Sequence, residues 1–251
     1  MKKNIKTILL YSITAILLIV MIGFSSVKRS YKQVNDVRVD IETLDGNYFT
    51  DKQEVLSLIN AESTDYVLGS SIGSLDLKLL EQRVKTHPFV KEAQVFKDLK
   101  GNLIIKVNQA KPLARIFNQN GEDTYIDTEG YLLPTTARQT ARVPIIEMER
   151  KFLWEENITE SRYGRQLLEL LHFIEGDEFW KAQIAGLLLQ KDGQVVMQPQ
   201  VTKQEIVFGM PEELEEKFKK LKLFYKEILP NKGWNTYSMV NLKFKYQIVC
   251  K

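Results

Sequence analysis

Few residues in this sequence are suited to acid–base or metal chemistry. It contains two histidines, His87 and His172, and one cysteine, Cys250. Zinc and iron–sulfur sites need several Cys or His ligands, so we expect neither a metal site nor a cofactor site. The sequence also has no glycine-rich phosphate-binding loop, no HExxH and no GxSxG motif. These observations predict a protein without catalytic residues.

The remaining titratable candidates have simpler structural interpretations. His172 lies within the apolar stripe LLELLHFI of a predicted helix, where a packed core histidine is expected rather than a general base. His87 precedes a proline, which indicates a turn. Asp127 and Glu129 come just before Gly130, and a turn explains this spacing better than a pair of catalytic carboxylates does.

A membrane-anchored Ser–Lys hydrolase, resembling a signal peptidase, is the enzyme alternative. That family places a Ser-Met-x-Pro block close to its membrane span, and Ser25-Ser26-Val27-Lys28 lacks this block. Ser238-Met239 lies far along the chain and continues as Val240-Asn241. A serine-reactive probe on the purified protein would test this alternative.

The distribution of charge argues against nucleic acid as a partner. The formal net charge is +3, and Lys2, Lys3 and Lys6 account for it, because the other 32 basic residues equal the 32 acidic residues in number. Nucleic-acid binding needs an excess of Lys and Arg on one face. No motif for a small-molecule substrate is present either.

An uncharged segment, Thr7–Val27, follows the basic N-terminus. As a helix it spans about 31 Å, close to the thickness of the hydrocarbon core of a bilayer. It is longer than the apolar part of a signal peptide, and residues 22–26 make a poor cleavage site. We therefore expect a tail at 1–6, a transmembrane helix at 7–27 and a linker at 28–35. Basic residues flank the segment on both sides, so charge leaves its orientation open.

Residues 36–110 are predicted to form a small α/β module. Alternation of apolar and polar residues from 37 to 41 indicates a strand. Thr50 fits the N-cap of a first helix and Ser74 that of a second. A hairpin that turns through Lys100-Gly101 follows. The predicted order is strand, helix, helix, strand, strand.

Residues 111–251 are predicted to form a mixed β-sheet domain with two helices, which makes the chain α+β. Strands are predicted at Pro112–Phe117, Tyr125–Asp127, Tyr131–Leu133, Ile184–Leu189, Gln194–Gln198 and Glu205–Phe208. The last helix begins near Pro211 and is expected to end at Pro230 and Gly233. This helix carries glutamate–lysine pairs at i,i+4, which are expected to form a solvated face. The pairs are Glu213–Lys217, Glu215–Lys219 and Glu216–Lys220.

The final segment, Tyr237–Lys251, is predicted to be one long strand. Leu242, Phe244, Tyr246 and Ile248 would face the core, and the residues between them would face solvent. The outer edge of such a strand offers unpaired N–H and C=O groups to a partner strand, although lysines on an edge also protect it from pairing. Trp234 and Tyr237, just upstream, would either anchor a partner or complete the core.

This order of segments resembles the FtsQ/DivIB cell-division family of bacteria. The module that begins VRVDIETLDGNYFTDKQEVLSLI and ends HPFVKEAQVFKDLKGNLIIKVNQAKPLARI is similar to a POTRA domain, a unit that receives partners. Tyr125–Pro134 resembles the family's Y-x-D-x-x-G-x-x-x-P strand and turn. Val240–Phe244 stands where the family usually has a D-L-R-Y-like strand, but Asn241 and Lys243-Phe244 depart from that pattern.

The resemblance implies a non-catalytic, single-pass type II protein of the inner membrane at the division septum, with a cytoplasmic tail and a periplasmic body. It implies a scaffold for FtsB/DivIC-like and FtsL-like single-span coiled-coil proteins, which regulate the septal peptidoglycan synthase FtsW–FtsI. The partner is expected to add a strand at the C-terminal edge. The residues expected to contact it are Trp234, Tyr237, Lys243, Phe244, Lys245, Tyr246, Gln247 and Ile248. A POTRA-bearing component of outer-membrane assembly or protein secretion is the alternative.

Overall fold

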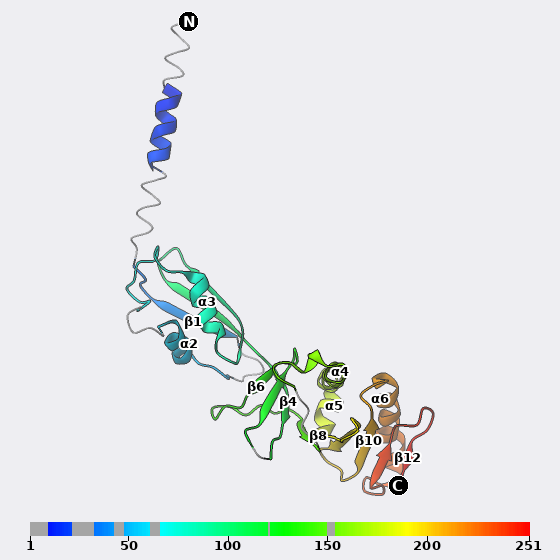
Figure 1. Cartoon of the computed structure of the whole chain (residues 1–251). Helices are drawn as coiled ribbons and strands as arrows, with labels where there is room; N and C mark the ends of the chain where they lie inside the picture. The colour runs from blue at the N-terminus through cyan, green and yellow to red at the C-terminus, as the bar shows by residue number, and fades with distance from the viewer. Residues whose placement is uncertain (1–9, 22–32, 43–47, 61–65, 120, 150–153) are drawn as a thin grey trace. The chain divides into compact units, whose positions relative to one another are not determined.

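The computed structural model describes residues 10–21, 33–42, 48–60, 66–119, 121–149 and 154–251. The chain divides into two compact units, Met1–Gln109 and Ala110–Lys251 (Figure 1). Each unit contains its own cluster of buried apolar side chains.

Residues 10–21 form a helix whose side chains are exposed. Within the part of the chain that the structure describes, no helix combines the length and the apolar character needed to cross a bilayer. Residues 7–9 and 22–27, the two ends of the predicted transmembrane segment, lie outside the described residues. The predicted tail and most of the predicted linker also lie outside them.

The first unit has the predicted strand–helix–helix–strand–strand order. Its elements are β1 (Val37–Glu42), α2 (Lys52–Ile59), α3 (Leu77–Lys85), β2 (Val90–Lys97) and β3 (Leu103–Gln109). β3 is the middle strand of the sheet, parallel to β1 and antiparallel to β2. Val55 of α2, Val84 of α3 and Ile105 of β3 belong to one core and have no exposed surface.

Both helices of this unit begin at aspartates rather than at the predicted hydroxyl residues. Asp51 accepts a hydrogen bond from the Glu54 amide at 2.8 Å, and Glu54 accepts one from the Asp51 amide at 3.1 Å, which completes a capping box. The Asp76 side chain caps α3 by accepting a hydrogen bond from the Leu79 amide at 3.1 Å. The caps predicted at Thr50 and Ser74 are therefore wrong, because a carboxylate one or two residues further on is an equally good acceptor.

The described residues of the second unit form a mixed sheet in the order β12-β11-β10-β9-β8-β7-β4-β5-β6. The strands are β4 (Pro112–Ile116), β5 (Thr124–Asp127), β6 (Leu132–Pro134), β7 (Ile145–Met148), β8 (Ile184–Leu189), β9 (Val195–Pro199), β10 (Glu205–Gly209), β11 (Met239–Asn241) and β12 (Val249–Cys250). β4, β7 and β8 run parallel to one another, and so do β10 and β11. The predicted mixed sheet is confirmed, but β7 is not among the predicted strands.

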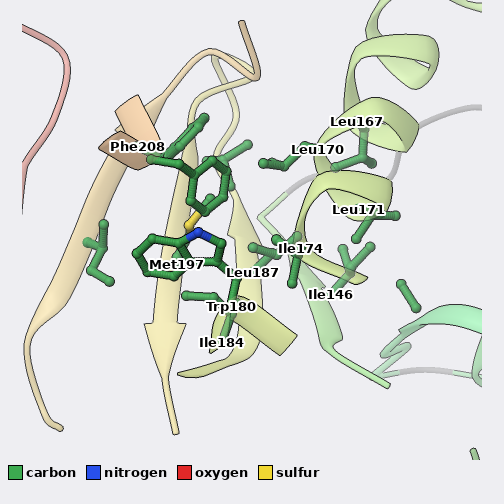
Figure 2. Packing of buried hydrophobic residues seen from close by; sticks show 14 of the residues in the cluster. Ile146, Leu167, Leu170, Leu171, Ile174, Trp180, Ile184, Leu187, Met197 and Phe208 are labelled. Carbon is green, nitrogen blue, oxygen red and sulfur yellow. The ribbon is translucent and has the colours of Figure 1, made fainter. Parts of the chain in front are cut away.

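The helices of the second unit are the 3₁₀ turn η1 (Ile158–Glu160), α4 (Arg162–Gly176), α5 (Glu178–Gln183), α6 (Leu214–Leu223), the π-helical turn η2 (Phe224–Ile228) and α7 (Leu229–Lys232). Figure 2 shows the core between them and the sheet, with side chains of α4 in the same cluster as Ile146, Leu187 and Trp180. Leu167, Leu170, Leu171 and Ile174 form the buried stripe of α4.

His172 is exposed, which contradicts its prediction as a core histidine. It follows Leu171 by one residue and therefore points about 100° away from the buried stripe. Its Nε2 lies 2.8 Å from the carbonyl oxygen of Thr128. The ring thus contacts the β5–β6 turn from outside the core.

The last helix does not end at Pro230. It continues from α6 through η2 into α7 and ends at Gly233, whose φ of 102° suits only glycine. Proline lacks a backbone N–H and clashes with the carbonyl four residues before it, so it normally interrupts a helix. The wider π-helical turn directly before α7 accommodates Pro230, as such turns do where the i→i−4 pattern is broken.

Candidate functional site

The C-terminal segment folds into two short strands, so the prediction of one long strand is wrong. β11 runs parallel to β10, and β12 turns back to pair antiparallel with β11. β12 is the last strand of the sheet at this end. Residues 242–248 form the connection between the two strands.

Asn241 marks the point at which the chain leaves the sheet. Its side-chain oxygen accepts a hydrogen bond from the Lys243 amide at 3.0 Å, the arrangement of an Asx turn. The amide of Leu242, one residue earlier, still donates to Val207 of β10 at 2.9 Å. The strand therefore stops because the Lys243 amide donates to the Asn241 side chain instead of to the backbone of a neighbouring strand.

The apolar residues of the connection do not share one face, contrary to the predicted alternation. Leu242 is fully buried and Ile248 is partly buried against the core. Phe244 is 45% exposed and Tyr246 is 88% exposed. Two aromatic rings therefore lie on the surface beside the terminal strand.

Lys220 of α6 holds this connection in place. Its ammonium group donates to the carbonyl oxygen of Leu242 at 3.0 Å and to that of Phe244 at 2.8 Å. Lys217, one turn earlier, is buried and donates to the carbonyl oxygen of Met210 at 2.7 Å. The predicted solvated face is therefore wrong for these two lysines. Burial lowers the pKa of Lys217 below its ordinary value.

Trp234 and Tyr237 rest on the same helical segment. The Trp234 ring centroid lies 6.3 Å from that of Tyr225, and the Tyr237 centroid lies 6.0 Å from that of Phe224. Trp234 is 48% exposed and Tyr237 is half-buried. Each ring thus packs on the core, as one of the two predictions expects, and leaves part of its surface exposed. Burial raises the pKa of the Tyr225 phenol beneath Trp234.

The two segments that carry the eight predicted contact residues both contact the α6–η2 helix. Lys220 fixes the connection that carries residues 243–248, and the aromatic residues of η2 support Trp234 and Tyr237. Lys243, Lys245 and Gln247 are exposed. The Lys243 ammonium donates to the Gln194 side chain at 3.0 Å, and that of Lys245 lies 5.6 Å from the Tyr246 ring centroid.

The outer edge of β12 presents backbone groups of Cys250. Lys251 and Met239 exchange two backbone hydrogen bonds, at 3.0 and 3.2 Å. Because hydrogen-bonded and non-bonded pairs alternate along antiparallel strands, the N–H and C=O of Cys250 point away from β11. The Val249 side chain on this strand is 38% exposed. The predictions do not include Val249, Cys250 or Lys220, because an alternating pattern does not reveal where a strand reverses.

The chemistry of this region is that of backbone pairing and apolar contact. Among the described residues, no group of three or more His, Cys, Asp or Glu side chains is placed to hold a metal ion. The Ser238 hydroxyl donates to the carbonyl oxygen of Lys251 at 3.1 Å, within the pairing of the chain end. Burial raises the pKa of the Cys250 thiol, which keeps it protonated at neutral pH.

Comparison with known proteins matches both units. Residues 111–251 match the family model described as FtsQ/DivIB, C-terminal related, and residues 32–108 match the model of the POTRA-like domain. The chain is similar to the cell division protein FtsQ of Rhodothermus marinus, with 26% identity over 187 residues. This match covers 73% of the chain and 68% of the relative.

Proposed function

The chain belongs to the FtsQ/DivIB family and is a component of the cell-division machinery, and on this premise we propose that it is a membrane-anchored, non-catalytic scaffold. The uncharged segment Thr7–Val27 would be its single anchor in the inner membrane. The POTRA-like unit and the sheet unit would lie in the periplasm at the division septum. The scaffold would join FtsB/DivIC-like and FtsL-like proteins and thereby regulate the septal synthase FtsW–FtsI.

One observation carries this proposal, namely the unpaired outer side of β12 at the end of the described sheet. A strand of the FtsB/DivIC-like partner would accept a hydrogen bond from the Cys250 N–H and donate one to its C=O. Such strand addition takes affinity from backbone pairing and specificity from neighbouring side chains.

The neighbouring side chains fit the centre and the rim of a small interface. Phe244 and Tyr246 offer exposed aromatic surface at its centre, and aromatic residues often dominate binding energies. Lys243, Lys245 and Gln247 are exposed polar residues suited to its rim. Trp234, Tyr237 and Ile248 would extend the apolar contact at the side of the helix.

A proline at Cys250 tests strand addition directly. Cys250→Pro removes the outward N–H and leaves the amides that pair β12 with β11 in place. Loss of one backbone hydrogen bond and misfit of the proline ring should weaken partner binding by about tenfold or more. The full-length protein in detergent would be titrated with the FtsB/DivIC-like partner by calorimetry.

Cys250→Ala is the matched control, because it removes the thiol and keeps the N–H. It should bind as the unaltered protein does, whereas deletion of Phe244–Lys251 should abolish binding. Equal affinity of Cys250→Pro and Cys250→Ala, in chains with the same circular dichroism, would contradict strand addition at β12.

A further inference from the structure

Three large apolar side chains stand out from two loops of the POTRA-like unit. Leu99, in the turn between β2 and β3, is 93% exposed. Tyr66 is 73% exposed and Leu68 is 59% exposed, on either side of the buried Val67 in the segment before α3. We call these three residues the loop patch. Single exposed leucines are common on protein surfaces and need no explanation. Whether the loop patch is a binding surface therefore depends on its position in the unit.

The two loops are joined to each other through the segment by which the chain enters the unit. The Val34 amide donates to Ser70 at 2.9 Å, and the Gly69 amide donates to Val34 at 3.0 Å. The Asn35 amide donates to Gly101 at 3.1 Å. Residues 34–35 thus lie between the loop of Leu68 and the turn of Leu99. The loop patch therefore occupies the end of the unit at which the chain arrives from the N-terminus.

A short stretch of chain separates this end from the uncharged segment. Val27 ends that segment, and Gln33 already pairs with Ser71 in the loop beside Leu68. Six residue steps cover about 20 Å at full extension. The proposed anchor therefore keeps Gln33 within about 20 Å of the end of the membrane span. This bound allows the loops beside Gln33 to reach the headgroup layer, which is about 5–8 Å deep on each side of the bilayer.

The electrostatics of the turn also suit a lipid surface. The Asp98 carboxylate accepts hydrogen bonds from the amides of Lys100 and Asn102, at 2.8 Å each, so it is directed toward its own turn. Lys100 is exposed next to Leu99. Lys28, Arg29 and Lys32 lie in the intervening sequence. Basic residues next to exposed apolar side chains favour the headgroups of anionic lipids.

We propose that the loop patch docks the POTRA-like unit on the bilayer that carries the chain's own anchor, with Leu68, Leu99 and Tyr66 inserted at headgroup level and Lys100 facing anionic lipid. Leucine and tyrosine both partition into this interfacial layer. Docking would fix the orientation of the unit at the membrane. This inference rests on the proposed anchor and adds a second membrane contact to it.

The full-length protein in nanodiscs of phosphatidylcholine and phosphatidylglycerol would test the proposal. Since Cys250 is the single cysteine, a Cys250→Ser background allows one environment-sensitive fluorophore to be attached at Leu99→Cys or Leu68→Cys. Lipids with a nitroxide on the headgroup should quench both probes about twofold or more, because interfacial side chains lie within about 10 Å of the headgroups. Quenching should weaken when phosphatidylglycerol is left out.

Tyr48→Cys is the matched control. Tyr48 is 51% exposed and adjoins Phe49, whose amide donates to Gln109 at 2.7 Å, close to where the chain leaves the unit. A probe at Tyr48 should remain unquenched. With the probe at Tyr66→Cys, Leu99→Asp should abolish quenching, whereas Leu79→Asp, on an exposed site of α3, should not.

The outcomes separate this inference from the proposed function. Retention of the protein in the nanodisc together with equal, weak quenching at Leu99, Leu68 and Tyr48 would overturn docking and leave the anchor intact. Failure of the protein to stay with the nanodisc would overturn the anchor, and docking with it. Quenching at Leu99 that persists in Leu68→Asp and is independent of phosphatidylglycerol would overturn the proposed mode of docking.

Discussion

Lys220 shows how one side chain can shape the end of a sheet. It lies on a helix among glutamates and lysines, yet its ammonium group binds two carbonyl oxygens of the segment after β11. These contacts turn the chain outward, expose Phe244 and Tyr246, and allow β12 to return along β11. In the proposed interface Lys220 would position the contact residues rather than contact the partner.

Replacement of Lys220 by methionine should loosen the terminal hairpin. Lys220→Met keeps the aliphatic stem and loses two charge-assisted hydrogen bonds, which should destabilise the hairpin by about 1–3 kcal/mol. Hydrogen exchange of amides 242–251 should become faster, and partner affinity should fall. Lys219→Met, on the exposed neighbouring position, is the control. Unchanged exchange in Lys220→Met would show that these bonds do not hold the hairpin.

Gly130 is a second residue whose identity the fold requires. It has a φ of 86°, and a Cβ there would lie 2.8 Å from Cγ2 of Thr159 and 2.9 Å from Oδ1 of Asn157. Asp127, beside it, accepts hydrogen bonds from the amides of Glu129 and Tyr131. The β5–β6 turn thus packs closely on the segment before α4.

Gly130→Ala should destabilise the second unit by about 1–3 kcal/mol, because strain in the backbone adds to the steric overlap. Thermal unfolding of the full chain would measure the loss. Gly176→Ala is the control, since no heavy atom lies within 4 Å of its Cβ position and its φ is not positive. A lowering of the melting temperature by Gly176→Ala as large as that by Gly130→Ala would contradict this argument.

At the level of elements, Glu175 of α4 links three segments through two ion pairs. Its Oε1 lies 2.9 Å from the ammonium nitrogen of Lys111, just before β4, and 2.9 Å from that of Lys181 on α5. Desolvation by partial burial raises the pKa of Glu175, but the hydrogen bonds from Lys181 and Lys111 outweigh it and the net pKa is lowered. Folding therefore favours the ionised carboxylate.

The ion pairs of Glu175 predict how the stability of the second unit depends on pH. Because the pKa of Glu175 is lower in the folded than in the unfolded state, its contribution is complete above the ordinary value of 4.5 and is lost as the pH falls through the folded value. Glu175→Gln should be less stable than the unaltered protein at neutral pH, and the difference should shrink as the pH falls below the ordinary pKa of 4.5. Urea unfolding of both proteins at several pH values would measure this difference in stability. A difference that does not change with pH would show that the ionised Glu175 carboxylate does not contribute to stability.

At the level of the whole molecule, two separate cores divide the tasks of the chain. The core around Ile105 belongs to the POTRA-like unit, and that around Trp180 and Phe208 supports the sheet whose last strand is the proposed partner-binding edge. Each core buries its own helices and strands, so a defect in one unit should remain local.

Ile105→Ala should test this division. Ile105 has no exposed surface, and its truncation should destabilise the first unit by about 2–5 kcal/mol. Hydrogen exchange should increase within residues 33–109, while affinity for the FtsB/DivIC-like partner should stay unchanged. A parallel loss of partner affinity would show that the two units depend on each other.

The cellular role also belongs to the whole molecule. Depletion of the protein in its host should give filaments without septa, and a fluorescent fusion should lie at midcell. The Cys250→Pro chain should fail to restore division, whereas Cys250→Ala should restore it. Normal division together with loss of outer-membrane proteins would instead favour the alternative role of a POTRA protein in export.

The sequence by itself determined the features that depend on local interactions. The βααββ order follows from hydrophobic periodicity, the turn at Gly101 from a glycine with a φ of 92°, and the turn at Asp127–Gly130 from residues that hydrogen-bond their own backbone. The family resemblance follows from the same local motifs in their order. The predicted contact residues came from the last segment for this reason as well, although the predicted core face is wrong for Phe244 and Tyr246.

Only the tertiary structure decided the features that depend on distant partners. β7 is only four residues long (Ile145–Met148), and its pairing with β4 and β8 makes it a strand. An alternating pattern is the same whether a strand continues or turns back, and Lys220 with Asn241 makes it turn back. The exposed rings of Phe244 and Tyr246 result from that reversal. The proposed binding edge therefore depends on contacts with α6, which lies about twenty residues away in sequence, so that no local pattern reveals them.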